Sequence, residues 1–250
     1  IMFIDTHCHI HEAYELPVDE VLARATEAEV TRLLCVGTSE ESSRLAIAFT
    51  QSGRYAAYAA VGVHPHDTKN GHADIAELAQ NDRVVAIGEV GLDYFYTHSD
   101  KQTQIAALEA QLRVATDNNL PVIFHVREAF DDFWPIFDSF EGLRGVLHSF
   151  TDSAENLQKA LDRGLYIGVN GISTFTKDED QQAMFDAIPL ESLVLETDAP
   201  FLTPKPYRGK INEPAYVRII AEHLAARRGL SLEEIAQATT HNATALFALS

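Results

Sequence analysis

The chain has 250 residues, 46% of them hydrophobic, so it can bury the core of one domain the size of a (β/α)8 barrel. No apolar run of about 18 residues could cross a bilayer, and no basic start precedes a long apolar stretch. We therefore expect a cytoplasmic protein without membrane association. A net charge of -18 excludes a general nucleic-acid surface, because such surfaces attract phosphates with clustered Lys and Arg.

Eight short apolar runs recur along the chain and are expected as strands: residues 2–5, 32–36, 58–63, 84–89, 122–125, 145–148, 165–169 and 193–196. Between them lie segments with the apolar period of a helix, among them residues 18–30, 42–51, 101–117 and 154–163. Near-continuously apolar strands that alternate with helices are typical of a parallel sheet covered by helices. Eight such units favour a closed TIM (β/α)8 barrel, as a single domain over residues 1–250.

The segment after the eighth expected strand predicts the closure of the barrel. A Pro-rich loop spans residues 199–214, and two helices follow it. The last helix is expected to begin at Ser231, where the sequence Ser-Leu-Glu-Glu has the form of a capping box. No segment indicates a second domain or an obligate protein partner.

Two histidines follow the first expected strand at a spacing of two. Side chains two apart on an extended chain point to the same side, so His7 and His9 could reach one metal ion. The spacing alone fits a polar strand end equally well. Asp5, on the same side of the strand, either orients His7 from behind or is a hydrogen-bonded aspartate at a strand end.

Position in the barrel decides between these readings. Glu89 closes the fourth expected strand, His125 the fifth and His148 the sixth, and Asp198 follows the eighth. These ends meet at the C-terminal mouth, where TIM barrels place their catalytic residues. Buried carboxylates beside imidazoles cost several kcal/mol unless a cation compensates them. The sequence therefore predicts a metal site that uses His7, His9, Glu89, His125, His148 and Asp198.

The ligand types limit the metal. Imidazole with carboxylate and no thiolate suits zinc, manganese, iron or magnesium. The predicted ligands are more numerous than one tetrahedral zinc requires, so we expect two divalent cations. Glu89 is the expected bridge between an ion near His7 and His9 and another near His125 and His148.

The motifs that carry these residues resemble the TatD family of metal-dependent deoxyribonucleases, within the amidohydrolase-like barrels, along essentially the whole chain. They read Phe3-Ile-Asp-Thr-His-Cys-His, Gly62-Val-His-Pro-His, Ile87-Gly-Glu-Val-Gly-Leu-Asp-Tyr, Pro121-Val-Ile-Phe-His-Val-Arg-Glu-Ala, His148-Ser-Phe, Leu195-Glu-Thr-Asp-Ala-Pro and Pro206-Tyr-Arg-Gly-Lys-Ile-Asn-Glu-Pro. The resemblance implies the same six ligands and a two-metal site. It also implies hydrolysis of ester bonds in DNA, with single strands or 3′ ends as substrate and trimming from the 3′ end.

In the mechanism that we expect, Asp198 and Glu89 are the catalytic residues. Cations at the rim lower the pKa of a water nucleophile, and Asp198 accepts its proton and passes it toward the leaving oxygen. His64, Arg127 and a loop with three basic residues are expected to bind phosphate; those three are Lys205, Arg208 and Lys210. The loop could instead be a solvated, Pro-fixed cover of the barrel. Tyr94 and Tyr96 could stack on bases or pack beneath a loop.

Two other functions compete with a nuclease. Because the same chemistry serves phosphoryl and carbonyl centres, the substrate could be a small phosphoester, lactone or amide. A barrel that serves only as a non-catalytic scaffold predicts the loss of at least one ligand. All six are present in this chain, which counts against that alternative.

Overall fold

The computed structural model describes residues 1–250 and contains one sheet of eight strands in the order β1 to β8. The strands are β1 (Phe3–Cys8), β2 (Val30–Val36), β3 (Ala57–Val61), β4 (Val84–Asp93), β5 (Val122–Arg127), β6 (Gly145–Leu147), β7 (Tyr166–Val169) and β8 (Leu193–Leu195). Each strand pairs in parallel with the next. Beyond β8, Ala199 bridges to Cys8, and the Asp198 N–H donates to the His7 carbonyl oxygen at 2.8 Å. The expected (β/α)8 barrel is confirmed.

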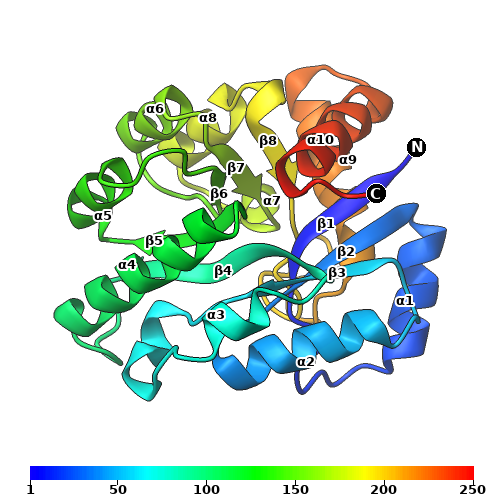
Figure 1. Ribbon diagram of the computed structural model, residues 1–250. Coiled ribbons are helices and arrows are strands. Elements are labelled where there is room, and N and C mark those ends of the chain that lie inside the picture. The colour runs from blue at the N-terminus through cyan, green and yellow to red at the C-terminus, as the bar shows by residue number, and fades with distance from the viewer.

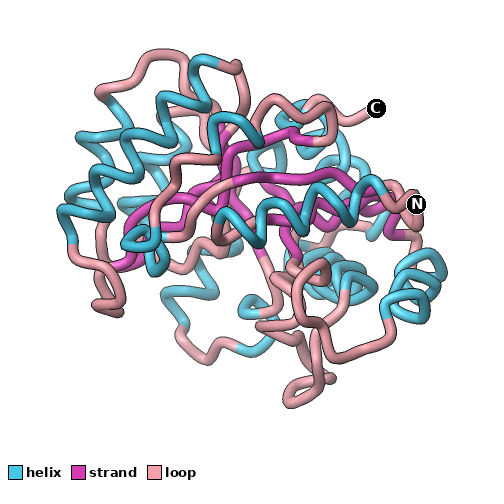
Figure 2. The backbone as a smooth tube through the Cα atoms, turned by 60° about the horizontal axis from the view of Figure 1, so that its bottom comes forward, coloured by secondary structure: helices cyan, strands magenta, loops and turns pink.

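Helices surround the strands on the outside (Figures 1 and 2). The α-helices are α1 (Val18–Glu27), α2 (Glu40–Gln51), α3 (Ile75–Leu78), α4 (Lys101–Asp117), α5 (Phe130–Asp138), α6 (Ala154–Asp162), α7 (Ile172–Phe175), α8 (Glu179–Ala187), α9 (Val217–Arg228) and α10 (Leu232–Phe247). Short 3-10 segments are η1 (Pro65–Asn70), η2 (Leu190–Ser192) and η3 (Pro214–Tyr216). The capping box predicted at Ser231 begins α10. None of these helices has the length and apolar character needed to span a membrane.

Three strands run further at their C-terminal ends than their apolar runs indicate. The first was expected to end at residue 5, the fourth at residue 89 and the fifth at residue 125, but β1 continues to Cys8, β4 to Asp93 and β5 to Arg127. In β4 the register with β5 shifts between Ile87 and Val90, a bulge that lets the strand continue past the buried Glu89. His7 therefore lies within a strand rather than beyond it, and Glu89 lies inside β4 rather than at its end.

The barrel interior is filled from its N-terminal end. A cluster of 12 buried apolar residues draws on every strand except β7. It also includes Ala243, Leu246 and Phe247 of α10 and Leu249 just beyond, so this helix closes the bottom of the barrel. A larger cluster of 50 buried residues includes residues of both the strands and the outer helices. With the bottom filled by apolar side chains, polar side chains inside the barrel gather at the opposite, C-terminal end.

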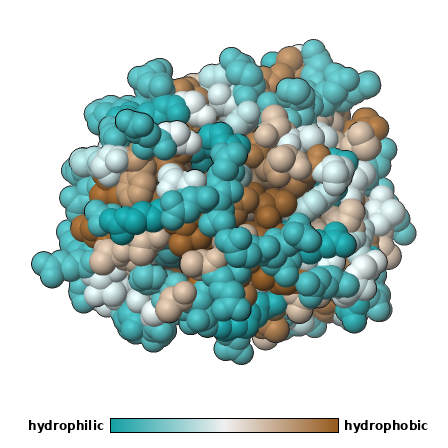
Figure 3. Space-filling model, viewed as in Figure 1, coloured by the Kyte–Doolittle hydropathy of each residue, from teal (hydrophilic) through white to brown (hydrophobic).

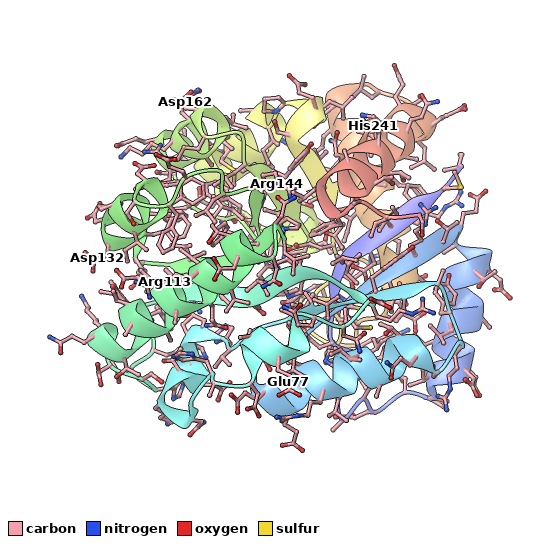
Figure 4. All side chains as sticks on the ribbon, viewed as in Figure 1. Glu77, Arg113, Asp132, Arg144, Asp162 and His241 are labelled. Atoms are coloured by element: carbon pink, nitrogen blue, oxygen red, sulfur yellow. The ribbon has the colours of Figure 1, made fainter.

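Most charged side chains lie on the outside of the molecule. Figure 4 shows Glu77 and Asp162 on outer helices, pointing away from the strands. In the same view, hydrophilic residues cover most of the molecular face and apolar residues gather near its centre (Figure 3). Much of the net charge of -18 is thus solvated.

Candidate metal centre

His7 of β1 and His9 just after it bring their Nε2 atoms close together. These two atoms lie 3.2 Å apart, and both side chains are buried. Nδ1–H of His9 donates to the carbonyl oxygen of Val36 at 2.8 Å. This hydrogen bond fixes the ring and leaves the Nε2 lone pair of His9 facing His7, which is the tautomer that a metal ligand requires.

Glu89 is the centre of the site, and its two oxygens face different partners. Oε2 lies 3.3 Å from Nε2 of His7 and 3.8 Å from Nε2 of His9. Oε1 lies 2.9 Å from Nδ1 of His125, 3.5 Å from Nε2 of His148 and 3.6 Å from Nε2 of His64. The carboxylate is 4% exposed. One buried side chain thus faces two sets of imidazoles, which meet where the rings of His7 and His148 stack with their centroids 3.6 Å apart.

His125 and His148 point into the barrel because each follows an interior residue by two positions. Ile123 and Val146 belong to the interior cluster, and alternate residues of a strand share a face. The sequence also allows β4 to approach β5 closely here. Gly91 has a φ of 156°, and a Cβ at this position would overlap the carbonyl oxygen of His125. Glycine at position 91 therefore permits the backbone packing that places His125 beside Glu89.

Each of these two histidines is held from behind by a carboxylate. Nε2–H of His125 donates to Oδ2 of Asp93 at 2.8 Å. Nδ1 of His148 lies 2.9 Å from Oε1 of Glu196. Glu196 has room beside β7 because Gly168 has no Cβ to displace its carboxylate. Carboxylates behind metal-binding histidines orient the rings and raise the basicity of the nitrogens that face the metal.

Asp198 completes the first group of ligands from the turn after β8. Its Oδ1 lies 3.2 Å from Nε2 of His9 and 3.6 Å from Nε2 of His7. Its backbone has a φ of 58° and is held by the hydrogen bond to the His7 carbonyl. Non-glycine residues in this left-handed region cost energy and cluster at functional sites.

Asp5 was expected either to orient the ring of His7 or to be a hydrogen-bonded aspartate at a strand end, and it has the second role. Its carboxylate accepts hydrogen bonds from the backbone N–H and the hydroxyl of Thr197 and from the backbone N–H of His7. It contacts the backbone of His7 rather than its imidazole, and so it joins β1 to the segment after β8. Burial raises the pKa of Asp5 to about 7.

The donors of the first group have spacings suited to a bound ion. Ligand atoms about 2.0 to 2.2 Å from a tetrahedral ion stand about 3.3 to 3.6 Å apart. The donors on His7, His9 and Glu89 are separated by 3.2 to 3.8 Å, and Oδ1 of Asp198 lies 3.2 and 3.6 Å from the two histidines. Three groups in the chain have ligand atoms within 4.8 Å of one another, and two of them share Glu89: His7, His9 and Glu89, and His64, Glu89 and His125. The residues present therefore fit a bound divalent cation.

The buried carboxylates of the site are stabilised by positive charge, as the pKa shifts of its residues indicate. Burial raises the pKa of Glu89, but His148, His64 and other imidazoles outweigh burial and hold that pKa well below its usual range. Burial lowers the pKa of His148, but Glu196 and Glu89 outweigh it and raise the value to about 10. For the same reasons the pKa of His9 is raised to about 9, mainly by Asp198. Glu89 stays ionised, and without a metal ion His9 and His148 retain protons in its place.

The centre opens into a pocket of about 570 Å³. His64 and Arg127 line this pocket together with His9, Glu89, His125, His148 and Asp198. Burial lowers the pKa of His64 to about 3, so its ring is neutral. Arg127 is the one Lys or Arg among the 17 residues of the lining, and its guanidinium packs 3.8 Å from the ring centroid of Phe95.

The structure does not bring the basic loop to the pocket. Lys205, Arg208 and Lys210 are absent from the lining. The guanidinium of Arg208 packs 3.9 Å from the ring of Phe175 and donates to the carbonyl oxygen of Thr203 at 2.9 Å. Nζ of Lys210 lies 5.2 Å from the ring of Tyr207. Contacts with neighbouring rings and backbone occupy two of these side chains, which fits the alternative of a loop that covers the barrel.

Three residues of the site were not predicted from the sequence. Asp93 and Glu196 hold His125 and His148, and Nε2 of His66 lies 3.0 Å from Oδ2 of Asp93. The signal for Asp93 was the apolar continuation Val-Gly-Leu after Glu89, which extends the strand to position 93. Glu196 follows Val194 of the interior cluster by two positions and so faces inward. His66 ends the motif Gly62-Val-His-Pro-His, but it was given no role in the sequence analysis.

Known proteins resemble the chain over its whole length. The family profile described as TatD related DNase matches residues 4–248. The chain is 38% identical to the uncharacterized metal-dependent hydrolase YabD of Bacillus subtilis, across 100% of both chains. It is 40% identical to the 3'-5' ssDNA/RNA exonuclease TatD of Citrobacter rodentium, covering 93% of this chain and 92% of that protein. The crystal structure of YJJV, a TatD homologue from Escherichia coli, matches with a TM-score of 0.90 at 30% identity, covering 99% of this chain and 98% of that chain. The chain belongs to the TatD family and is a metal-dependent hydrolase.

Proposed function

We propose that this enzyme hydrolyses phosphodiester bonds in single-stranded DNA, trimming from the 3′ end, with two divalent cations. The observation that carries the proposal is the division of the Glu89 carboxylate, whose two oxygens face two groups of imidazoles. A carboxylate that bridges two ions is a recurrent feature of two-metal hydrolytic sites. Relatives named 3'-5' ssDNA/RNA exonuclease TatD, 37 to 40% identical to the chain, support the choice of nucleic acid.

In this proposal Glu89 would contribute to the binding of both ions. His7, His9 and Asp198, which face Oε2 or one another, would hold the first ion with Glu89. His125 and His148, which face Oε1, would hold the second with Glu89. His64 joins the second group as a neutral ligand, because burial lowers its pKa to about 3 and a neutral ring is a poor cationic clamp for phosphate.

Bound divalent cations supply the positive charge that acidifies a water nucleophile and stabilises the charge that develops on the phosphoryl oxygens. The chain supplies the proton acceptor. The side chain of Asp198 is 13% exposed, more than any other proposed ligand of the first ion, and lies on the wall of the pocket. Burial raises its pKa, but His9 and the other imidazoles outweigh burial and keep the carboxylate ionised. Asp198 can therefore take a proton from water and release it toward the leaving oxygen.

Arg127 is the group that we assign to the substrate phosphate. As the only Lys or Arg of the lining, it is the permanent positive charge that a phosphodiester meets in the pocket. Its packing on Phe95 holds the guanidinium at the pocket wall. Guanidinium groups bind phosphate oxygens through paired, charge-assisted hydrogen bonds.

The test uses metal-stripped protein and a 5′-labelled single-stranded oligonucleotide, with magnesium, manganese or zinc added back in turn. We expect a metal-dependent ladder of shortened products. Glu89→Gln and Asp198→Asn should abolish the ladder, whereas the matched changes Glu77→Gln and Asp162→Asn, at exposed positions of outer helices, should retain it. DNA that stays intact under every metal, together with turnover of a small phosphoester, lactone or amide, would overturn the nuclease assignment and leave the hydrolase.

A further inference from the structure

Exposed aromatic residues gather at the mouth of the site. Six large apolar residues of the chain are exposed, and three of them are aromatic: Phe95, Tyr96 and Phe201. Phe95 and Tyr96 follow β4, and Phe201 lies in the turn after β8. Both loops leave the C-terminal ends of their strands, where the metal centre lies. Large rings that stay in water beside a polar pocket are available to contact a ligand.

The two loops stand on opposite sides of the barrel. In a closed ring with the strand order β1 to β8, β4 and β8 are four strands apart in either direction (Figure 1). The ligand Glu89 comes from β4, and Asp198 comes from the turn after β8. A substrate seated at the metal centre therefore has one aromatic loop on each side of its reacting phosphate.

Phe201 forms the wall on the β8 side. Its side chain is 59% exposed, the highest value among the large apolar residues, yet it lines the pocket. The centroid of its ring lies 6.4 Å from that of His9, one of the proposed ligands. A ring so close to the metal centre is within reach of a base attached to the reacting phosphate.

On the opposite side the pocket is lined by Arg127, which stacks on Phe95 behind it. The guanidinium lies 3.8 Å from the Phe95 centroid and 5.4 Å from that of Tyr96. The loop is fixed in place, because Oδ1 of Asp93 accepts hydrogen bonds from the backbone N–H groups of Phe95, at 3.0 Å, and Tyr96, at 3.3 Å. Guanidinium planes and aromatic rings both serve as platforms for unpaired bases. This wall is therefore preformed.

The charges around the pocket favour recognition through bases rather than through a long phosphate backbone. Apart from Glu89 and Asp198, the lining carries the carboxylates of Glu12 and Asp67, and Arg127 is its one permanent cation. A polyphosphate chain beyond the reacting phosphate meets no further Lys or Arg of the pocket. Stacking on aromatic rings supplies affinity that does not depend on neutralised phosphates.

We propose that Phe201 and the Arg127–Phe95 stack are two base-binding subsites on either side of the metal centre. This inference rests on the proposed nuclease function and narrows its substrate. The enzyme takes a phosphodiester flanked by an unpaired base on each side, so a dinucleotide is the smallest good substrate. A duplex end is a poor substrate, because both bases would have to leave their stack first.

The test pairs protein variants with substrates that lack one base. The substrates are a dinucleotide with two adenines and two analogues in which either base is replaced by an abasic sugar. Phe201→Ala and Phe95→Ala should each lower kcat/KM on the full dinucleotide by about 5- to 150-fold, the range that base stacking supports. On the analogue that lacks the base of its own subsite, each variant should have the same kcat/KM as the wild-type enzyme. The analogue on which this happens should differ between the two variants. Leu45→Ala, a change at an exposed apolar residue of α2, is the control and should behave as the wild type on all three.

Binding of the same three compounds to metal-stripped protein, which cannot turn them over, gives a second readout and should follow the same pattern. Equal losses on all substrates, or no loss in either variant, would overturn the base subsites while the nuclease function stands. A wild-type enzyme that cleaves no oligonucleotide would instead overturn the proposed function. If both metal-stripped variants then also bound the three compounds as the wild type does, the subsites would be overturned as well.

Discussion

The carboxylate of Asp93 accepts a hydrogen bond from Nε2–H of His125 at 2.8 Å, and Nδ1 of the same ring faces Oε1 of Glu89 at 2.9 Å. Without a metal ion both ring nitrogens can donate to carboxylates, since burial lowers the pKa of His125 but Asp93 and Glu89 outweigh burial and raise it. When the ring is neutral, a proton kept on Nε2 by Asp93 leaves the Nδ1 lone pair for a metal ion. The second oxygen of Asp93 holds the backbone of the loop that carries Phe95. Asp93 thus connects a proposed metal ligand with the substrate side of the pocket.

Asp93→Asn should weaken metal binding. The neutral amide cannot hold His125 as firmly or raise its basicity, so we expect the affinity for the second ion to fall about 10- to 100-fold. Titration of metal-stripped protein against a chelating indicator measures this loss. Asp138→Asn, which removes only the exposed partner of Arg163, should keep the wild-type affinity. Wild-type affinity in Asp93→Asn would show that the carboxylate has no role at the metal.

Arg127→Met should impair substrate binding without affecting the metals. Methionine keeps much of the side-chain length but loses the charge that we assign to the phosphate, so KM for a single-stranded oligonucleotide should rise about 10- to 100-fold. Metal affinity should stay unchanged. The control is Arg113→Met on the outer helix α4 (Figure 4). An unchanged KM in Arg127→Met would mean that the phosphate is bound elsewhere.

Phe247→Ala should destabilise the barrel from the end opposite the site. Phe247 is 2% exposed and belongs to the cluster that fills the barrel interior. Removing such a ring leaves a cavity that costs about 3 to 5 kcal/mol. Urea denaturation should show this loss in the free energy of unfolding, with metal affinity retained at low denaturant. Leu45→Ala, at an exposed position, should change stability by less than about 0.5 kcal/mol. A loss in Phe247→Ala no larger than that control would contradict the assignment of α10 as the plug.

The metal-free protein should lose stability as the pH rises from 6.5 toward 9. The pKa of His9 is raised from 6.5 to about 9, and that of His148 from 6.5 to about 10. A proton held more tightly in the folded chain stabilises it fully below pH 6.5, and this contribution is lost as the pH passes the raised values. Metal binding requires neutral imidazoles, so the rise in Tm on adding zinc or manganese should be larger at pH 8.5 than at pH 6.5. Thermal unfolding of both forms at the two pH values measures this, and a larger rise at pH 6.5 would contradict it.

The barrel could be predicted from the sequence because its signals are local and repeated. Eight apolar runs separated by helical periodicity require only the strand and helix periods to be recognised. The ligands followed from topology, since the ends of parallel strands converge on one mouth. His125 and His148 needed no more than that argument, and the structure places both beside Glu89.

The remaining parts of the site depend on contacts between distant segments. The bulge at Glu89 carries β4 on to Asp93. The apolar residues after Glu89 indicate that the strand continues, but the register shift depends on the pairing with β5 and has no local signal. The basic loop was expected to bind phosphate because of its charge density. Arg208 instead packs on Phe175, a contact between residues 33 positions apart in the chain that composition cannot reveal.

The proposed two-metal site depends most directly on Glu89 as a ligand shared by two ions. The measurement that tests it is the number of metal ions bound per chain, determined by elemental analysis after metal-stripped protein is equilibrated with zinc or manganese and freed of excess metal. We predict two ions in the wild type, two in Glu77→Gln, and fewer than two in Glu89→Gln. One ion per wild-type chain, or two tightly held ions in Glu89→Gln, would contradict the bridging role.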